Sequence, residues 1–225
     1  MSFKQEAIMV KMPRNYSDHP LLSRLAILLD EEALWDLDII YKSSGTTVRT
    51  SGFLLSLLSP TCQRMVCGAF RERSDRRVEL DDTMEPGAAV FRKLLNLACG
   101  EEVAVEGGLT GLLDLARLAD HFQMEEVLGA LQDAALDCLS LSSAALVLAQ
   151  AVPSALPRLV EAARQMALDR FDEVATSPSF LQLPADALAA LVDDEDLAAH
   201  TEEGVLRAVL CWATAAASAG APSST

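Results

Sequence analysis

The sequence predicts a small α+β domain followed by an all-α domain. Two β-type segments with turn residues between them lie near residues 37–50, whereas nearly every segment after residue 85 repeats its apolar residues at helical spacing. Hydrophobic residues make up 51% of the chain but aromatic residues only 5%, and most apolar side chains are Leu, Ala or Val. This composition favours helices over a β-sandwich, and 225 residues are enough for two domains.

The first 18 residues predict a flexible N-terminal arm, because they are polar and interrupted by Pro13. Asp18 and Pro20 then indicate the start of a helix. An apolar stripe runs along this helix, formed by Leu21, Leu22, Leu25, Ala26, Leu28 and Leu29. Such a stripe is typical of a domain core, and it is equally typical of a subunit interface.

The clearest hairpin of the chain comes next. Residues 37–41 and 46–48 predict two strands, and the Ser-Ser-Gly turn at 43–45 joins them. Residues 53–58 predict a short helix, and Ser59-Pro60 predicts the start of a second helix that runs towards Phe70. Residues 78–80 alternate as a short strand.

Helices dominate the rest of the chain. They are predicted at residues 89–97, 109–119, 124–136, 144–151, 156–171, 184–192 and 202–215. Gly100 and the Gly107-Gly108 pair mark breaks between them, as do several prolines. The predicted organisation is an arm at 1–18, a first domain at 19–136, an all-α domain at 137–215 and a linker or frayed tail at 216–225.

The formal net charge of −15 is unevenly distributed. Residues 1–77 contain 11 basic and 9 acidic residues, whereas residues 78–225 contain 7 basic and 24 acidic residues. A strongly acidic C-terminal part argues against nucleic acid as the main partner, because phosphate backbones attract Lys and Arg. No uninterrupted apolar run reaches the ~18 residues of a membrane span, and residues 1–14 do not resemble a signal peptide.

The cysteines and histidines predict no catalytic or metal site. The five cysteines are scattered, namely Cys62, Cys67, Cys99, Cys138 and Cys211. Their odd number and spacing indicate buried, reduced thiols of a cytoplasmic or nuclear protein. The three histidines lie far apart, and the acidic run at 193–196 lacks the pattern of a calcium loop and predicts a solvated loop or helix cap. We therefore expect no enzyme activity, no cofactor and no metal.

The order of elements in the first part resembles the BTB (POZ) fold. Residues 35–41 are similar to its first strand, with Asp36 at the usual acidic position, and residues 48–60 are similar to the strand and helix that end in Ser-Pro. Residues 78–80 match the third strand, and residues 91–100 and 112–128 match the later helices. Two departures are Ser51-Gly52, where the family usually has His-Lys, and Cys99, where an aromatic residue is usual.

The second part resembles a BACK domain, as in Kelch-like adaptors. Asp137-Cys138-Leu139 is similar to its opening motif, residues 179–183 to its Ser-Phe-Leu-Gln-Leu motif, and residues 202–212 to its terminal helix. A Kelch array usually follows BACK in this family, and none is visible in this sequence, so no substrate is predicted. Ser51 and Gly52 give Asp36 no basic partner, so the charged groove of co-repressor-binding members is not expected.

The resemblance implies two partner surfaces. Phe70-Arg71-Glu72 falls where cullin-binding members carry a hydrophobic residue, any residue and Glu, and Leu139 and Leu141 lie in the BACK opening that widens the cullin groove. A homodimer interface is implied for the first helix, at Leu21, Leu22, Leu25 and Leu28. The alternatives are that Phe70 caps its own helix, that the stripe is an intrachain core, and that the BACK opening only packs between domains.

The function implied is an adaptor that brings an unknown substrate protein to a cullin-RING ubiquitin ligase and dimerises through its BTB domain. The chemistry of ubiquitin transfer would then belong to other subunits. The alternative is a homo-oligomeric BTB scaffold with no ubiquitin role. Neither hypothesis involves nucleic acid or a membrane.

Overall fold

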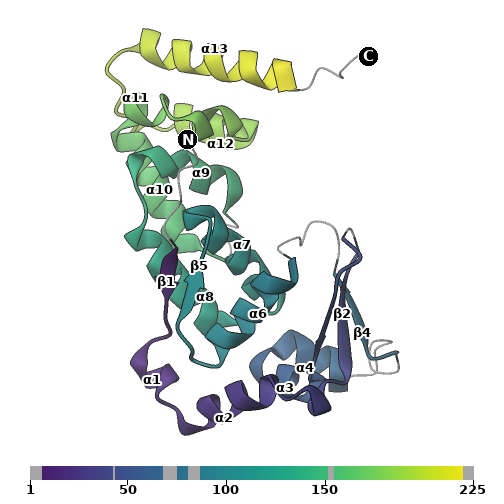
Figure 1. Cartoon of the computed structure of the whole chain (residues 1–225). Helices are drawn as coiled ribbons and strands as arrows, with labels where there is room; N and C mark the ends of the chain where they lie inside the picture. The colour runs from purple at the N-terminus through teal and green to yellow at the C-terminus, as the bar shows by residue number, and fades with distance from the viewer. Residues whose placement is uncertain (1–6, 43, 68–74, 81–86, 152–154, 220–225) are drawn as a thin grey trace, which may run out of the picture. The chain divides into compact units, whose positions relative to one another are not determined.

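The computed structural model describes residues 7–219 except 43, 68–74, 81–86 and 152–154. The chain forms two compact units, Met1–Ala134 and Ala135–Thr225, which are drawn from purple to yellow in Figure 1. The division falls within helix α8 (Glu125–Asp137). The first unit contains the described strands and seven described α- or 3-10 segments before α8, and the second unit is helical.

A three-stranded sheet organises the first unit. Its order is β3 (Thr47–Thr50), β2 (Leu37–Tyr41), β4 (Arg77–Leu80), with β2 antiparallel to β3 and parallel to β4. Ile39 lies opposite Val48 and beside Val78. Alternate residues of β2 are buried, because successive side chains of a strand point to opposite faces. The predicted hairpin and third strand are confirmed.

Helices complete the core of the first unit. They are α1 (Arg14–Ser17), α2 (Pro20–Leu29), η1 (Glu32–Leu34), α3 (Gly52–Leu58), α4 (Pro60–Cys67), α6 (Gly87–Ala98) and α7 (Gly108–His121). The buried rings of Phe91 and Phe122 lie 5.6 Å apart between centroids. Ser59 links two segments, because its Oγ donates to the Phe122 carbonyl (2.6 Å) and accepts from the Cys62 amide (3.1 Å). The predicted helix starts at Pro20 and Pro60 are confirmed.

The N-terminal segment differs from the predicted flexible arm. Residues 8–10 form β1 (Ile8–Val10), which pairs antiparallel with β5 (Val103–Val105), a strand in a region predicted to be helical. Val10 and Met12 are almost fully buried, and Tyr16 Oη donates to the Ala98 carbonyl at 2.7 Å. Burial of these apolar side chains stabilises the segment against the first unit. Three-residue strands are too short to show a period in the sequence.

The second unit consists of short, successive helices. They are α9 (Leu141–Gln150), α10 (Pro157–Asp169), α11 (Phe171–Val174), η3 (Pro178–Gln182), α12 (Ala185–Val192) and α13 (Glu202–Ala219). Phe171 and Phe180 meet edge to face, with centroids 5.8 Å apart, in the buried core. Proline occupies the first turn of α10 and of η3, where its missing N–H leaves no hydrogen bond unmade. The predicted helices of this region are confirmed.

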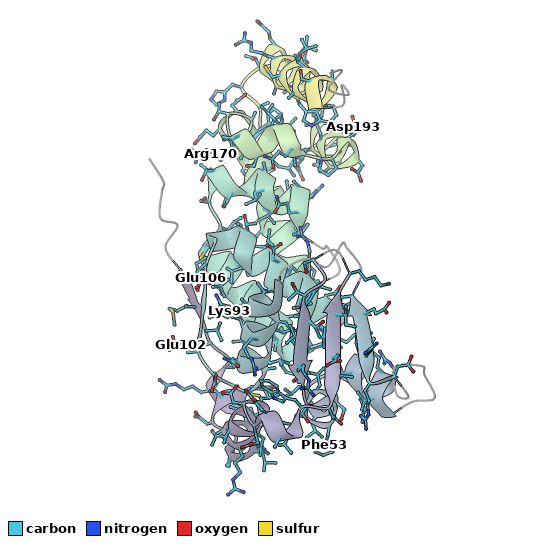
Figure 2. The ribbon with its side chains drawn as sticks, turned by 45° about the vertical axis from the view of Figure 1, so that its right-hand side comes forward. Phe53, Lys93, Glu102, Glu106, Arg170 and Asp193 are labelled. Carbon is cyan, nitrogen blue, oxygen red and sulfur yellow. The ribbon has the colours of Figure 1, made fainter. Side chains whose placement is uncertain are left out.

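The segment between α12 and α13 is held by residues of α10. Arg164 forms an ion pair with Asp194, whose side chain is mostly buried, and the Ala198 amide donates to the Leu168 carbonyl (3.0 Å). The acidic run is therefore only partly the solvated loop that the sequence predicted, although Asp193 is exposed, as Figure 2 shows. No described helix is long and apolar enough to cross a membrane.

Candidate protein-interaction surface

Large apolar side chains are exposed on α2 and on the neighbouring α3. Ile27 is 72% exposed, Phe53 65% and Leu21 58%, and Leu28 and Leu57 are also exposed. The two helices pack beside each other, and Figure 2 shows Phe53 at the end of the first unit where they meet. We call these five residues the α2–α3 surface. Large exposed apolar patches often mark protein-interaction sites, so these residues are candidates for one.

The structure divides the four residues of the predicted dimer interface. Leu21 and Leu28 are exposed, whereas Leu22 and Leu25 are half-buried on the side of α2 that ends in the buried Leu29. The intrachain alternative therefore fits Leu22 and Leu25, whereas the dimer interface stays a prediction for the exposed Leu21 and Leu28. Ile27 was not among the residues predicted for the stripe. Because α2 is apolar on nearly all sides, its pattern did not indicate which side faces outward.

The C-terminal end of α2 is held firmly against the first unit. The Trp35 indole donates to the Leu29 carbonyl at 2.9 Å, and the Arg92 guanidinium lies 5.4 Å from the centroid of the Trp35 ring. Arg92 also binds Asp30 Oδ1 at 3.1 Å. These contacts satisfy a carbonyl at the helix end that would otherwise have no partner. The exposed stripe is thus displayed on an anchored helix, which reduces the ordering needed on binding.

Asp36 has a basic partner, contrary to the expectation from the sequence. Its Oδ2 lies 3.3 Å from Arg76 Nη1, and its Oδ1 accepts from the Gly52 amide at 2.8 Å. Ser51 begins α3, with its Oγ accepting from the Leu54 amide at 3.5 Å. The basic residue usual in the family falls at position 52, whereas the fold brings the cation beside Asp36 from Arg76, immediately before β4. Ser51 and Gly52 therefore serve the start of α3.

The predicted cullin-binding motif cannot be placed. Phe70, Arg71 and Glu72 lie outside the described residues, in the interval between α4 and β4. Their role stays a prediction from the resemblance.

The BACK opening presents two partly exposed leucines. Leu139 and Leu141 flank Ser140, which caps α9, with its amide donating to Ser143 Oγ at 3.0 Å. Ser179 Oγ of the following 3-10 helix donates to the Ser142 carbonyl at 3.3 Å. The start of α9 is therefore fixed by local hydrogen bonds, with a half-buried leucine on each side of its capping serine.

Two buried cysteines, Cys62 and Cys99, are unsuited to nucleophilic chemistry. Burial raises the pKa of the Cys62 thiol to about 12, and it raises the pKa of Cys99 likewise to about 12. Cys62, Cys99, Cys138 and Cys211 are free thiols, and Cys211 is exposed, which corrects the prediction that it is buried. Within the described parts of the chain, no group of three His, Cys, Asp or Glu residues is arranged to hold a metal ion.

Sequence comparisons agree with the division into units. Residues 144–221 match the family described as BACK, "BTB And C-terminal Kelch", and this range runs from within α9 through α13. The chain is 24% identical to Kelch-like protein 40 of Xenopus laevis over 201 aligned residues. This alignment covers 89% of this chain and 32% of that protein. The chain is related to the Kelch-like BTB–BACK proteins. Its second unit therefore contains a BACK domain, as the sequence resemblance implied.

Other Kelch-like relatives show the same partial coverage. Human Kelch-like protein 41 is 24% identical over 199 residues, which are 88% of this chain and 32% of that protein. Mouse Kelch-like protein 17 is 29% identical over 176 residues, which are 78% of this chain and 27% of that protein. The chain thus spans about a third of the length of the relatives it matches. The order of helices and strands in the first unit is compatible with a BTB fold.

Proposed function

We propose that this chain is a non-enzymatic adaptor that forms a homodimer through the α2–α3 surface and brings a substrate protein to a cullin-RING ubiquitin ligase. The observation that carries the proposal is the exposed apolar surface of Leu21, Ile27, Leu28, Phe53 and Leu57 on an anchored helix pair. Its relationship to Kelch-like BTB–BACK proteins supports the adaptor role.

Burial of the α2–α3 surface would stabilise a dimer. Each large apolar side chain that passes from water into an interface contributes about 1.5–3 kcal/mol when burial is complete. Five such side chains can offset a substantial part of the entropy lost on association. The same surface on both protomers would meet itself across a two-fold axis, which is the commonest arrangement of homodimers.

The cullin contact would use two segments. Phe70 would fill an apolar pocket of the cullin while Glu72 accepts charge-assisted hydrogen bonds beside it, and Arg71 lies between them. Leu139 and Leu141 would add apolar contacts from the BACK opening. The substrate would be another protein, in the cytoplasm or nucleus, where the free thiols of the chain stay reduced.

A binding assay with purified protein tests the proposal. Wild-type chain and the double variant Phe70→Ala/Glu72→Ala are mixed with a panel of cullin N-terminal domains, and light scattering gives the mass of the chain alone. The matched control is Leu210→Ala/Glu203→Ala, which makes a similar change on the exposed side of α13. We expect twice the chain mass, binding to one cullin, and loss of binding only in the first variant.

The scaffold alternative gives a different result. A well-folded dimer that binds no cullin of the panel would contradict the ubiquitin-ligase role. The chain would then be a homo-oligomeric scaffold that brings its partners together.

A further inference from the structure

The last described helix, α13, presents large apolar side chains to solvent along one side. Leu206 is 59% exposed and Leu210 58%, and their spacing of four residues places both on the same side of the helix. Ala208 and Trp212 are half-buried on the opposite side, where the Trp212 indole donates to the Leu183 carbonyl at 2.8 Å. Figure 1 shows α13, in yellow, as the outermost helix of the second unit. The side with the two leucines therefore faces away from the core of that unit.

This outward side of α13 is uncharged over most of its length. Residues 208–219 contain no Asp, Glu, Lys or Arg. A shallow groove runs along this side, and its lining includes Leu210, Cys211, Thr214 and Ser218. A helix side that faces solvent normally carries charged or polar residues. An uncharged outward side with exposed leucines is instead suited to contact with another protein.

Both hydroxyl side chains of α13 lie along this groove and are hydrogen-bonded within the helix. Thr214 Oγ1 donates to the Leu210 carbonyl at 2.7 Å, and Ser218 Oγ donates to the Thr214 carbonyl at 2.8 Å. A hydroxyl that binds the carbonyl four residues earlier keeps its hydrogen bond when an apolar surface covers it. The groove from Leu210 onward can therefore be buried without leaving these hydroxyls unsatisfied.

The start of α13 differs from the rest of the helix, because it is strongly acidic. Residues 193–203 contain six Asp or Glu residues and no Lys or Arg. Glu203 is paired with Arg207 at 3.0 Å, whereas Glu202 is exposed and has no ion-pair partner among the described residues. A protein segment that covers the outward side would thus meet carboxylates at one end and an uncharged surface along the remainder.

We propose that the outward side of α13, over residues 206–218, binds an amphipathic helix of a partner protein whose basic last turn contacts Glu202 and Glu203. The inference goes beyond the proposed adaptor function. It gives the chain a binding surface that neither the proposed homodimer nor the proposed cullin contact uses.

The spacing of the exposed residues selects a helix as the partner element. Leu206, Leu210, Ala213 and Ala217 follow the i, i+4, i+7, i+11 spacing that a second helix matches at a small crossing angle. The two alanines leave room for large apolar side chains of the partner. In an antiparallel pair the C-terminal end of the partner lies beside the acidic start of α13. Its own helix dipole favours Lys and Arg at that end, as do the carboxylates.

Two synthetic peptides test the stripe and the charge together. Both are amphipathic helix formers of about the length of α13, with Leu along one side. One peptide carries Lys in its last turn and the other carries Glu. Each is labelled with a fluorophore, and its anisotropy is recorded as the full chain is added. We expect the Lys peptide to bind about tenfold more tightly than the Glu peptide or better, and Glu202→Lys/Glu203→Lys to reverse this order.

Matched variants separate the proposed surface from general attraction to an acidic protein. Glu101→Lys/Glu102→Lys makes the same charge change at another exposed pair of glutamates and should keep the preference for the Lys peptide. Leu210→Asp should weaken binding of the Lys peptide about tenfold or more. Leu21→Asp, at a side chain of α2 with the same 58% exposure, should not. Far-UV circular dichroism and the urea midpoint show that each variant is folded.

Cys211 reports on the covered side directly, because it is exposed and lines the groove beside Leu210. Bound Lys peptide should reduce alkylation of Cys211 by iodoacetamide in proportion to the bound fraction, measured by mass spectrometry after digestion. Alkylation of Cys138, which lies outside α13, should stay unchanged.

The outcomes decide between this proposal and its alternatives. A Lys peptide that does not bind, or that binds Leu210→Asp as tightly as the wild type, would overturn it. Equal affinity of the two peptides would overturn the role of the acidic start. A wild-type dimer that Leu210→Asp converts to monomers by light scattering would mean that α13 binds a second copy instead. A monomeric wild type that binds the Lys peptide would overturn the proposed homodimer and support this surface.

Discussion

Asp36 joins three segments of the first unit through one carboxylate. It precedes β2, accepts from the amide at the start of α3, and faces Arg76, which leads into β4. Arg76 has a left-handed backbone (φ 52°), which side chains other than glycine adopt infrequently. The Asp36 contact and the hydrogen bond from the Asp38 amide to the Arg76 carbonyl (3.0 Å) help to hold it there.

Replacing Asp36 by Ala should lower the free energy of unfolding by about 1–2 kcal/mol, because the Gly52 amide loses a charged acceptor. Urea unfolding followed by circular dichroism measures the change. Glu79→Ala is the control, since the ion pair of Glu79 with Lys42 is exposed and worth about 0–1 kcal/mol. Equal effects of the two substitutions would contradict the bridging role of Asp36.

Ser59 should be sensitive to substitution, because it is buried and links α4 to the Phe122 backbone. Its hydroxyl is buried and has partners on both sides, so Ser59→Ala leaves the Phe122 carbonyl without its donor. We expect a loss of about 1–3 kcal/mol in the free energy of unfolding. Ser56→Ala, the same change at an exposed hydroxyl, should stay within about 0.5 kcal/mol of the wild type. Comparable urea midpoints for the two variants would count against this account.

At the scale of elements, the attachment of α13 depends on few contacts. None of its described residues is fully buried, although the Trp212 indole donates to the Leu183 carbonyl at 2.8 Å. Before α13 begins, Asp172 of α11 accepts from the His200 amide at 2.9 Å and also contacts the His200 ring. Asp172 thus holds the segment that leads into α13 against α11.

Acidification should weaken the contact between Asp172 and His200. The hydrogen bond from the His200 amide, together with the bond from its side chain, lowers the pKa of Asp172 below its ordinary 3.8. A lowered pKa in the folded state gives stabilisation that is present above the ordinary carboxyl pKa and is lost as the pH falls through the folded value. Hydrogen exchange of the α13 amides, measured from pH 6 to below pH 4, should therefore accelerate relative to α10.

The Asp172→Asn variant tests whether protonation of Asp172 causes the faster exchange of α13. It should show faster α13 exchange already at pH 6 and a weaker dependence on pH, after correction for intrinsic exchange rates. Asp186→Asn, at an exposed position of α12, should behave as the wild type does. A wild-type pH profile in Asp172→Asn would mean that another carboxyl controls α13.

The sequence predicted elements whose signals are local. Pro20, Pro60 and Pro157 each mark a helix start, and the turn near Gly45 marks the hairpin. The pairing of β1 with β5 joins segments far apart in the chain, and neither strand has enough residues to show its period. The partner of Asp36 was missed for the same reason, because Arg76 is brought to it by the sheet. The composition of α2 indicated that the helix is apolar, but it did not indicate which side of the helix faces solvent.

At the scale of the whole molecule, the two units have different kinds of core. The first is built on a sheet with helices, and its N-terminal segment is part of the core through Val10 and Met12. The second is helical and centred on Phe171 and Phe180. A substitution that destabilises one core should therefore increase local unfolding mainly in the unit that contains that core.

Met12→Ala provides this test. Truncation of a buried methionine costs about 2–5 kcal/mol, so hydrogen exchange should accelerate in β5, α6 and α7 while α10 and α11 keep their protection. Met9→Ala changes a side chain of the same strand region that is exposed, and it should have little effect. Uniform acceleration over both units after Met12→Ala would mean that they unfold as one.

The positions of the two tryptophans have a practical consequence. Trp35 lies in the first unit beneath the Arg92 guanidinium, and Trp212 lies in the second with its indole bound to a carbonyl. Each unit therefore contains one tryptophan in a distinct environment. Replacing either residue by Phe leaves tryptophan emission from a single unit, so the loosening of α13 or of the α2 anchor can be followed optically without any attached dye.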